Sequence, residues 1–101
     1  MVIIQESKIE KRLKKEIEKI GGKALKFISP GVTGMPDRIV LLPLGKIIFI
    51  ELKAPGEKPS PIQEYRAKQY RKLGFDVRCI DSTEAVMDLI NEVKVNAICT
   101  P

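Results

Sequence analysis

Three charged side chains stand together at one end of a predicted β-hairpin. Asp37 lies just ahead of the apolar run Ile39–Leu42, and the run Ile47–Ile50 ends in Glu51 and Lys53. Burying charge costs several kcal/mol unless it is compensated. A hairpin in a small protein core has no structural need for two acids and a lysine at one end, so this grouping indicates a functional site.

The turn of the hairpin determines which of these residues face one another. Residues 42–45 (LPLG) suit a type I turn, with proline at the second position and glycine at the fourth, and the glycine fits the left-handed position of a three-residue loop. Counting back along both strands from this loop puts Asp37 opposite Glu51. Side chains alternate along a strand, so Glu51 and Lys53 share one face, roughly 6–7 Å apart.

Two carboxylates that face each other across a hairpin repel, and a cation between them would relieve the repulsion. Mg²⁺ suits oxygen ligands, needs one or two carboxylates, and completes its coordination with water and substrate phosphate. Lys53 would orient the attacking water or offset charge on the phosphate. The alternative is that charges lie at strand ends because the ends are wet, with Glu51 and Lys53 forming a surface ion pair. Metal-dependent phosphodiester hydrolysis is the chemistry that fits the set.

The composition limits the class of protein. The 101 residues, 44% hydrophobic and 31% charged, suit one globular domain over residues 1–101. The net charge of +5 and the pI of about 9.3 favour a polyanionic partner, nucleic acid before membrane, with a solvated basic surface as the alternative. The chain has no histidine, which excludes His-based acid–base catalysis, His metal sites and Ser-His-Asp chemistry.

The cysteines and the apolar segments bear on location. Cys79 and Cys99 lack the CxxC spacing of a zinc site. Cys79 lies in an apolar run, so we expect a buried thiol and a reducing, cytoplasmic setting. No apolar stretch approaches the ~20 residues that span a bilayer, and Met1–Ile4 is too short for a signal-peptide core. We therefore expect no membrane partner.

The elements that position the hairpin follow from periodicity and from stop signals. Apolar residues recur at helical spacing in three segments, and glycines end the first two of these. Ser60-Pro61-Ile62-Gln63 has the features of a helix start, with a capping-box serine and glutamine around a proline. The predicted helices cover 7–20, 60–73 and 83–93, and the predicted strands cover 23–28, 39–42, 47–50 and 76–80. The order αβββαβα predicts an α/β sandwich with a short mixed sheet.

Glu10 is followed along the chain by the strings GMPDR (34–38), FIELKAP (49–55), PSPIQ (59–63) and GFDV (74–77). In this order, these elements resemble the VRR-NUC domain of the PD-(D/E)xK nuclease superfamily. The resemblance covers residues 6 to 82 and has one mild departure, Met35 where the family commonly has valine. The tyrosine of the QxxxY helix found in related nucleases is absent, since Ala67 follows Gln63 by four residues, and no role for it is carried over.

The resemblance implies a restriction-endonuclease-like fold and a divalent-metal nuclease using Mg²⁺, with Mn²⁺ as the alternative. Family roles fall on Asp37, Glu51 and the Leu52 carbonyl as metal ligands and on Lys53 in catalysis. Glu10 would be a further ligand, and Gln63 would complete the catalytic set.

Glu10 and Gln63 also have structural interpretations. Ser7-Lys8-Ile9-Glu10, like the segment ending at Gln63, fits a capping box, in which the third helical residue bonds back to the cap. Glu6, one turn earlier, is the rival of Glu10 for the place of the helix-borne acid. One glutamine side chain can serve both as cap and in the site.

Stand-alone members of such a family resemble Holliday-junction resolvases. A four-way junction is cut in two strands, which matches a two-fold homodimer with one site per subunit. Branched or structured DNA is therefore the expected partner, read by shape rather than by base sequence. The alternatives are a non-catalytic nucleic-acid-binding module on a nuclease fold and a flap or single-strand nuclease. Basic residues close in sequence to the site are candidates for DNA binding, with ordinary solvated side chains as the alternative: Lys23, Lys26, Arg38, Lys46 and Lys58.

Overall fold

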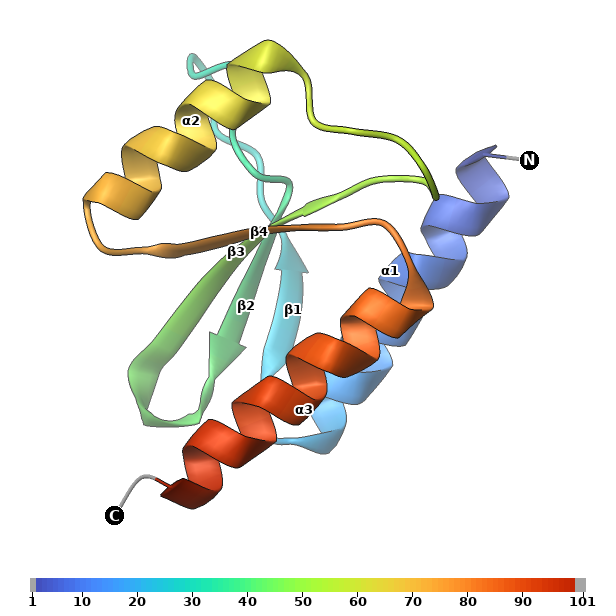
Figure 1. Cartoon of the computed structure of the whole chain (residues 1–101), viewed down its shortest axis with the longest axis vertical. Helices are drawn as coiled ribbons and strands as arrows, with labels where there is room; N and C mark the ends of the chain where they lie inside the picture. The colour runs from blue at the N-terminus through green and yellow to red at the C-terminus, as the bar shows by residue number, and fades with distance from the viewer. Residues whose placement is uncertain (1, 100–101) are drawn as a thin grey trace.

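The chain forms a four-stranded sheet with helices on both faces (Figure 1). The computed structural model describes the backbone of residues 2–99 and the side chains of residues 7–95. The elements occur in the predicted αβββαβα order. Their bounds are α1 Val2–Lys19, β1 Lys23–Lys26, β2 Arg38–Leu42, β3 Lys46–Leu52, α2 Pro61–Lys72, β4 Asp76–Ile80 and α3 Thr83–Cys99.

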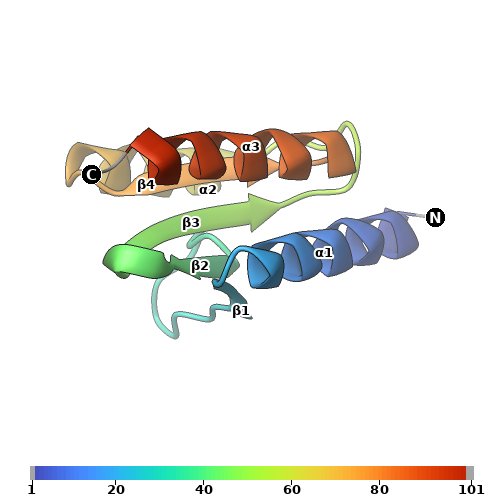
Figure 2. The same cartoon turned by 90° about the horizontal axis from the view of Figure 1, so that it is seen from below.

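The sheet has the strand order β1-β2-β3-β4 and is mixed, as predicted. The first three strands are antiparallel, and β4 runs parallel to β3 after a crossover through α2. Helices α1 and α3 lie together against one face, and α2 lies on the other (Figure 1). Both views show α1 and α3 as neighbours (Figures 1 and 2). This arrangement confirms the α/β sandwich.

The core lies between the sheet and the α1–α3 pair. Alternate residues of β3, Ile48, Ile50 and Leu52, are all at most 2% exposed, and they face the apolar stripes of both helices. Ile17 of α1 and Ile90 of α3 are fully buried in the same cluster. The side chains of the odd-numbered residues of this segment point to the other face of the sheet. Glu51 and Lys53 therefore lie on the α2 side.

The hairpin has the predicted register but a different turn. Arg38 pairs with Ile50 and Leu42 pairs with Lys46, which confirms the predicted alignment. Leu44 has φ of 68° in place of the negative φ of a type I turn. A left-handed leucine costs about 1–2 kcal/mol, and the conformation still closes a three-residue loop, so the register is unchanged.

Two helices are longer than predicted. Helix α1 begins at Val2 rather than near Ser7, and α3 continues to Cys99 rather than ending near Val93. No glycine or proline interrupts either extension, and the two helices pack against one another. Within the described part of the chain, no helix is long and apolar enough to cross a membrane.

Candidate active site at the open end of the hairpin

Asp37 lies one residue beyond the last pair of the β2–β3 ladder, where the register continues toward Glu51. The Phe27 backbone N–H donates to the Asp37 carbonyl at 2.9 Å, so the Asp37 backbone remains joined to the strand before it. Its carboxylate turns toward β3, where Oδ1 accepts a hydrogen bond from the Leu52 N–H at 3.0 Å. The carboxylate therefore takes the place of a ladder carbonyl at the end of the hairpin.

Glu51 and Lys53 share one face of β3, as alternation predicts. Lys53 Nζ lies 3.9 Å from Glu51 Oε2. Glu51 is only 9% exposed, so the pair differs from a surface ion pair at a wet strand end. The backbone N–H of Lys53 donates to the Ile80 carbonyl of β4. Backbone groups of successive residues point to opposite sides of a strand, so the N–H and carbonyl of Leu52 point toward Asp37.

Arg38 lies in the interior rather than on the surface. It is 9% exposed, because it has the same parity along β2 as the buried Val40 and Leu42. Its Nη1 lies 2.9 Å from the Asp37 carbonyl oxygen and 3.2 Å from Asp37 Oδ2, and its Nη2 bonds the Glu10 carboxylate. The sequence placed Arg38 among exposed phosphate contacts, whereas in the structure its guanidinium joins two acids.

Glu10 is not a helix cap. Ser7 lies inside α1, which begins at Val2, so the predicted capping box around Ser7 does not form. Glu10 reaches Arg38 from the third turn of the helix. The side chain of Glu6, the alternative acid, lies outside the described residues. Among residues 7–95, no three His, Cys, Asp or Glu side chains form a group that could hold a metal ion, and the role of Glu10 as a metal ligand stays a prediction.

Gln63 forms the predicted cap and also borders the site. Its Oε1 accepts from the Ser60 N–H at 2.8 Å, and Ser60 Oγ accepts from the Gln63 N–H at 3.3 Å. The same side chain lines a cavity of about 250 Å³ between α2 and the sheet, together with Glu51, Lys68 and Cys79. The Gln63 side chain therefore caps the helix and also lines the cavity that Glu51 borders.

The segment before Asp37 is held against α2. Gly34 has φ of +83°, and a Cβ there would come within 2.8 Å of the Ile62 carbonyl oxygen, so glycine is required. Arg66 Nε donates to the Thr33 carbonyl at 2.9 Å. The GMPDR string thus positions Asp37 by close packing as well as by the ladder.

Cys79 corrects a sequence expectation. It was predicted to be buried, but it is exposed and lines the α2-side cavity beside its register partner Glu51. Alternation along β4 places it on the face opposite Ile80, where α2 does not cover it. Partial removal of water, and then the charges of Asp81 and Glu51, raise the pKa of the thiol. Alternation alone does not predict this exposure, because Val77 on the same face of β4 is buried.

The remaining basic candidates are spread over the molecule. Lys23 and Lys26 are exposed and line a groove of about 470 Å³ between α1 and β1, which Glu10 also borders. Lys58 is exposed in the loop before α2. Lys46 begins β3 at the turn of the hairpin, roughly 17 Å along the strand from Glu51 at ~3.4 Å per residue. The structure therefore separates Lys46 from the site.

Comparison with known proteins gives two close similarities. The chain is 54% identical over 84 residues to a protein of Acyrthosiphon pisum secondary endosymbiont phage 1 named "Putative nuclease p44", covering 83% of this chain and 90% of that protein. A solved structure described as a VRR_NUC domain superposes with a TM-score of 0.81 at 35% identity, covering 86% of this chain and 95% of the other. No family model matches the chain.

Proposed function

Because the chain belongs to the VRR_NUC family of nucleases, we propose that it hydrolyses the phosphodiester backbone of branched DNA with a divalent metal ion. The observation that carries the proposal is the grouping of Asp37, Glu51 and Lys53 at the open end of one hairpin. A structural role alone does not require two acids and a lysine there. One of the acids, Glu51, is only 9% exposed, and burying a charge is costly.

The oxygen groups at this end fit Mg²⁺. Asp37 and Glu51 supply two carboxylates, and the Leu52 carbonyl points to the same side of β3 as the N–H that bonds Asp37. Mg²⁺ is commonly held by one or two carboxylates, with water and substrate phosphate filling the other positions. We assign the metal to these three groups. When bound, it supplies Lewis-acid stabilisation of the charge that develops on the phosphate.

Lys53 and Gln63 act on the substrate from either side of Glu51. The Lys53 ammonium, held 3.9 Å from Glu51, orients the attacking water and offsets negative charge on the phosphate. The Gln63 carbonyl oxygen serves the helix cap, while its amide NH₂ supplies two donors for a phosphate oxygen in the neighbouring cavity. Lys23, Lys26 and Lys58 extend the positive surface for the flanking backbone.

The substrate is a four-way junction and the active form is a homodimer. A chain of 101 residues with a net charge of +5 can hold the backbone of DNA. Sites related by a two-fold axis would cut two strands of a junction symmetrically. Glu10 is left out of this ligand set, because Arg38 bonds both Glu10 and Asp37.

The test is an incubation of the purified protein with end-labelled linear duplex, flap, splayed-arm and four-way DNA, with and without Mg²⁺. We expect paired, Mg²⁺-dependent nicks in the four-way junction and little cutting of the linear duplex. Preferred cutting of the flap or splayed arm would favour the flap or single-strand nuclease. Binding without cutting would leave a non-catalytic module.

The oligomeric state is tested separately by light scattering. We expect about twice the 11.3 kDa mass of the chain at micromolar concentration. A monomer that persists with DNA bound would contradict the resolvase proposal, whatever the outcome of the cleavage assay.

A further inference from the structure

We propose that one exposed face of α2 binds single-stranded DNA and leads it to the candidate site. This face, which we call the α2 surface, consists of Tyr65, Lys68, Gln69 and Lys72. The inference rests on the proposed function, and it adds that the bound strand has unpaired bases beside the branch point of the DNA. None of the basic residues that the sequence singled out lies on this helix.

The composition of α2 indicates a role outside the core. None of its side chains is buried. Most of the stability of a helix in a protein comes from packing of an apolar face, which α2 contributes very little. The segment Pro61–Lys72 has four basic residues and one acidic residue, a net charge of +3 in a chain whose total is +5. This concentration of positive charge favours an anionic partner.

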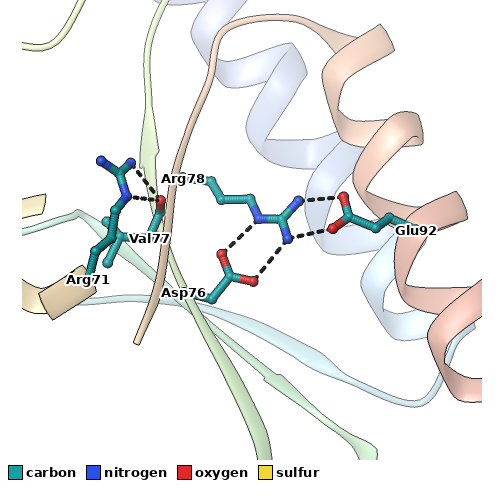
Figure 3. Close-up of polar contacts among 5 residues, drawn as sticks. All are labelled: Arg71, Asp76, Val77, Arg78 and Glu92. Atoms are coloured by element: carbon teal, nitrogen blue, oxygen red, sulfur yellow. Dashed lines mark hydrogen bonds and ion pairs between the residues drawn. The ribbon is translucent and has the colours of Figure 1, made fainter. Parts of the chain in front are cut away.

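One arginine attaches α2 to the sheet, whereas two lysines remain for a ligand. The Arg71 guanidinium donates to the Val77 carbonyl of β4 at 2.7 and 3.0 Å (Figure 3). Lys68 and Lys72 are exposed. Neither lysine takes part in the ion pairs formed within residues 7–95. Their ammonium groups are therefore available to phosphates.

Tyr65 provides an aromatic ring on which a base can stack. The residue is 57% exposed, and the Arg66 guanidinium lies over the ring, 5.5 Å from its centroid. Arg66 is itself held by a hydrogen bond to the Thr33 carbonyl at 2.9 Å, so it keeps the ring in place. Surfaces that bind single strands combine aromatic rings, on which the bases stack, with positive charges along the backbone.

The spacing of these residues places the ring and the lysines in one row. Tyr65, Lys68, Gln69 and Lys72 follow one another at intervals of three, one and three residues, so all four share one face of the helix. They line a surface hollow of about 640 Å³. Pockets for small ligands measure roughly 300–1,000 Å³, so the hollow is large enough for a nucleotide.

The α2 surface adjoins the cavity beside the candidate site. Lys68 and Arg71 line the hollow, and they also line the cavity of about 250 Å³ that Glu51 and Gln63 border. A strand that lies in the hollow is thus led past Lys68 toward Glu51. Bases in a duplex are already stacked on their neighbours, so Tyr65 favours a strand that is unpaired where it leaves the site.

Binding is tested with the full chain in EDTA, by fluorescence anisotropy of a labelled oligothymidylate. We expect the single strand to bind more tightly than a duplex of the same length. Tyr65→Ala should weaken binding by at least ~5-fold, the scale for the loss of one stacked base, whereas Tyr65→Phe should bind as the wild type does. Lys68→Ala and Lys72→Ala should each lower the salt dependence, the slope of log K against log [salt], by about 0.7. Lys94→Ala is the matched control, because it removes an exposed lysine of α3, on the other face of the sheet.

Stacking itself is measured from tyrosine fluorescence. The chain has two tyrosines and no tryptophan, so Tyr70→Phe leaves Tyr65 as the fluorescent ring. Oligothymidylate should quench this emission, and poly-L-glutamate should not. Equal quenching by poly-L-glutamate, duplex binding as tight as that of the single strand, or a Tyr65→Ala protein that binds as tightly as wild type would overturn the inference. If Tyr70→Phe does not fold, the comparison of Tyr65→Ala with Tyr65→Phe still decides.

The cleavage assay separates this inference from the proposed function. A wild type that nicks the four-way junction but does not bind oligothymidylate retains the nuclease and loses the α2 surface. A wild type that binds oligothymidylate through Tyr65 but cuts no DNA retains the α2 surface and loses the nuclease.

Discussion

Two arginines of this protein are each held between two carboxylates, and only one of them lies at the candidate site. Arg78 joins β4 to α3 (Figure 3). Its Nε and Nη2 bond the two oxygens of Asp76 at 2.8 and 2.9 Å, and its Nη1 and Nη2 bond the two oxygens of Glu92 at 2.6 and 2.8 Å. Both acids use both oxygens on one arginine, which is a clamp between a strand and a helix.

The Arg38 cluster has a different setting. Asp37 bonds the Leu52 N–H as well as Arg38, and it faces Glu51 across the hairpin. Glu51 in turn lies beside Lys53. Arg78 of β4 is therefore a structural clamp between its two acids. The cluster of Arg38 at β2 also adjoins a third acid, Glu51, and a lysine, Lys53. The comparison indicates that the extra acid and lysine, rather than the arginine and its partners, mark a site.

The largest expected difference between the two regions is in catalysis. Lys53→Ala should lower the cleavage rate by at least ~10²-fold, the scale for a positioned acid–base or electrostatic group. Junction binding should change little, as gel-shift titration would show. Asp76→Asn, in the Arg78 clamp, should cut at the wild-type rate at 25 °C. Equal losses of binding and cleavage in Lys53→Ala would make Lys53 a phosphate contact instead.

The variants Asp37→Asn and Asp76→Asn should have similar stabilities without metal and different stabilities when metal is present. Without metal, Asp37→Asn and Asp76→Asn should each lose about 1–3 kcal/mol, because each weakens hydrogen bonds between charged groups. Repulsion between Asp37 and Glu51, taken alone, would predict no loss of stability for Asp37→Asn. The hydrogen bond from Leu52 and the contact with Arg38 reverse that expectation.

Metal should then stabilise one variant and not the other. At ~10 times Kd, Mg²⁺ adds about 1.4 kcal/mol, or roughly 4–8 °C in Tm for a domain of this size. Asp76→Asn should keep this shift and Asp37→Asn should lose it, as thermal denaturation would measure. A Mg²⁺ shift that survives in Asp37→Asn would place the metal elsewhere.

The Arg78 clamp should show a pH dependence of stability. The hydrogen bond from Arg78 lowers the pKa of Glu92. A carboxylate whose folded pKa is lowered contributes stability that is present above its unfolded pKa of about 4.3 and is lost as the pH falls through the folded value. Glu92→Gln should therefore be less stable than wild type at pH 7, and the difference should shrink at acid pH. A difference that is constant with pH in urea denaturation would show that the ion pair is not its source.

The smallest effect is expected on the pKa of the Cys79 thiol. This pKa depends on the charge of Glu51, next to the Arg38 cluster, and not on Glu92 of the Arg78 clamp. Partial burial makes the largest contribution to the raised pKa of the Cys79 thiol, and the negative charges of Asp81 and Glu51 raise it further. Glu92 does not contribute to this shift. In a Cys99→Ser background, Glu51→Gln should lower the pKa of the thiol and speed its alkylation at pH 8, while Glu92→Gln should not. Equal rates in the two variants would mean that Glu51 is not close enough to affect the thiol.

The sequence by itself determined the features that depend on neighbours along the chain. The length of the loop at residues 43–45 and the alternation of the strands were enough to align Asp37 with Glu51 and to place Lys53 on the same face. The cap from Ser60 to Gln63 formed as predicted, because its two hydrogen bonds join residues three apart. The family motifs and the order of elements are likewise local in the chain, and they led to the correct fold.

Only the tertiary structure decided which charged and polar groups are covered. Arg38 is buried because α1 lies across its face of β2 and brings Glu10 to it from 28 residues away. Cys79 is exposed because α2 leaves that part of its face of the sheet uncovered. Burial and ion pairing between distant segments depend on how elements pack, and the periodicity of a single element does not contain that information.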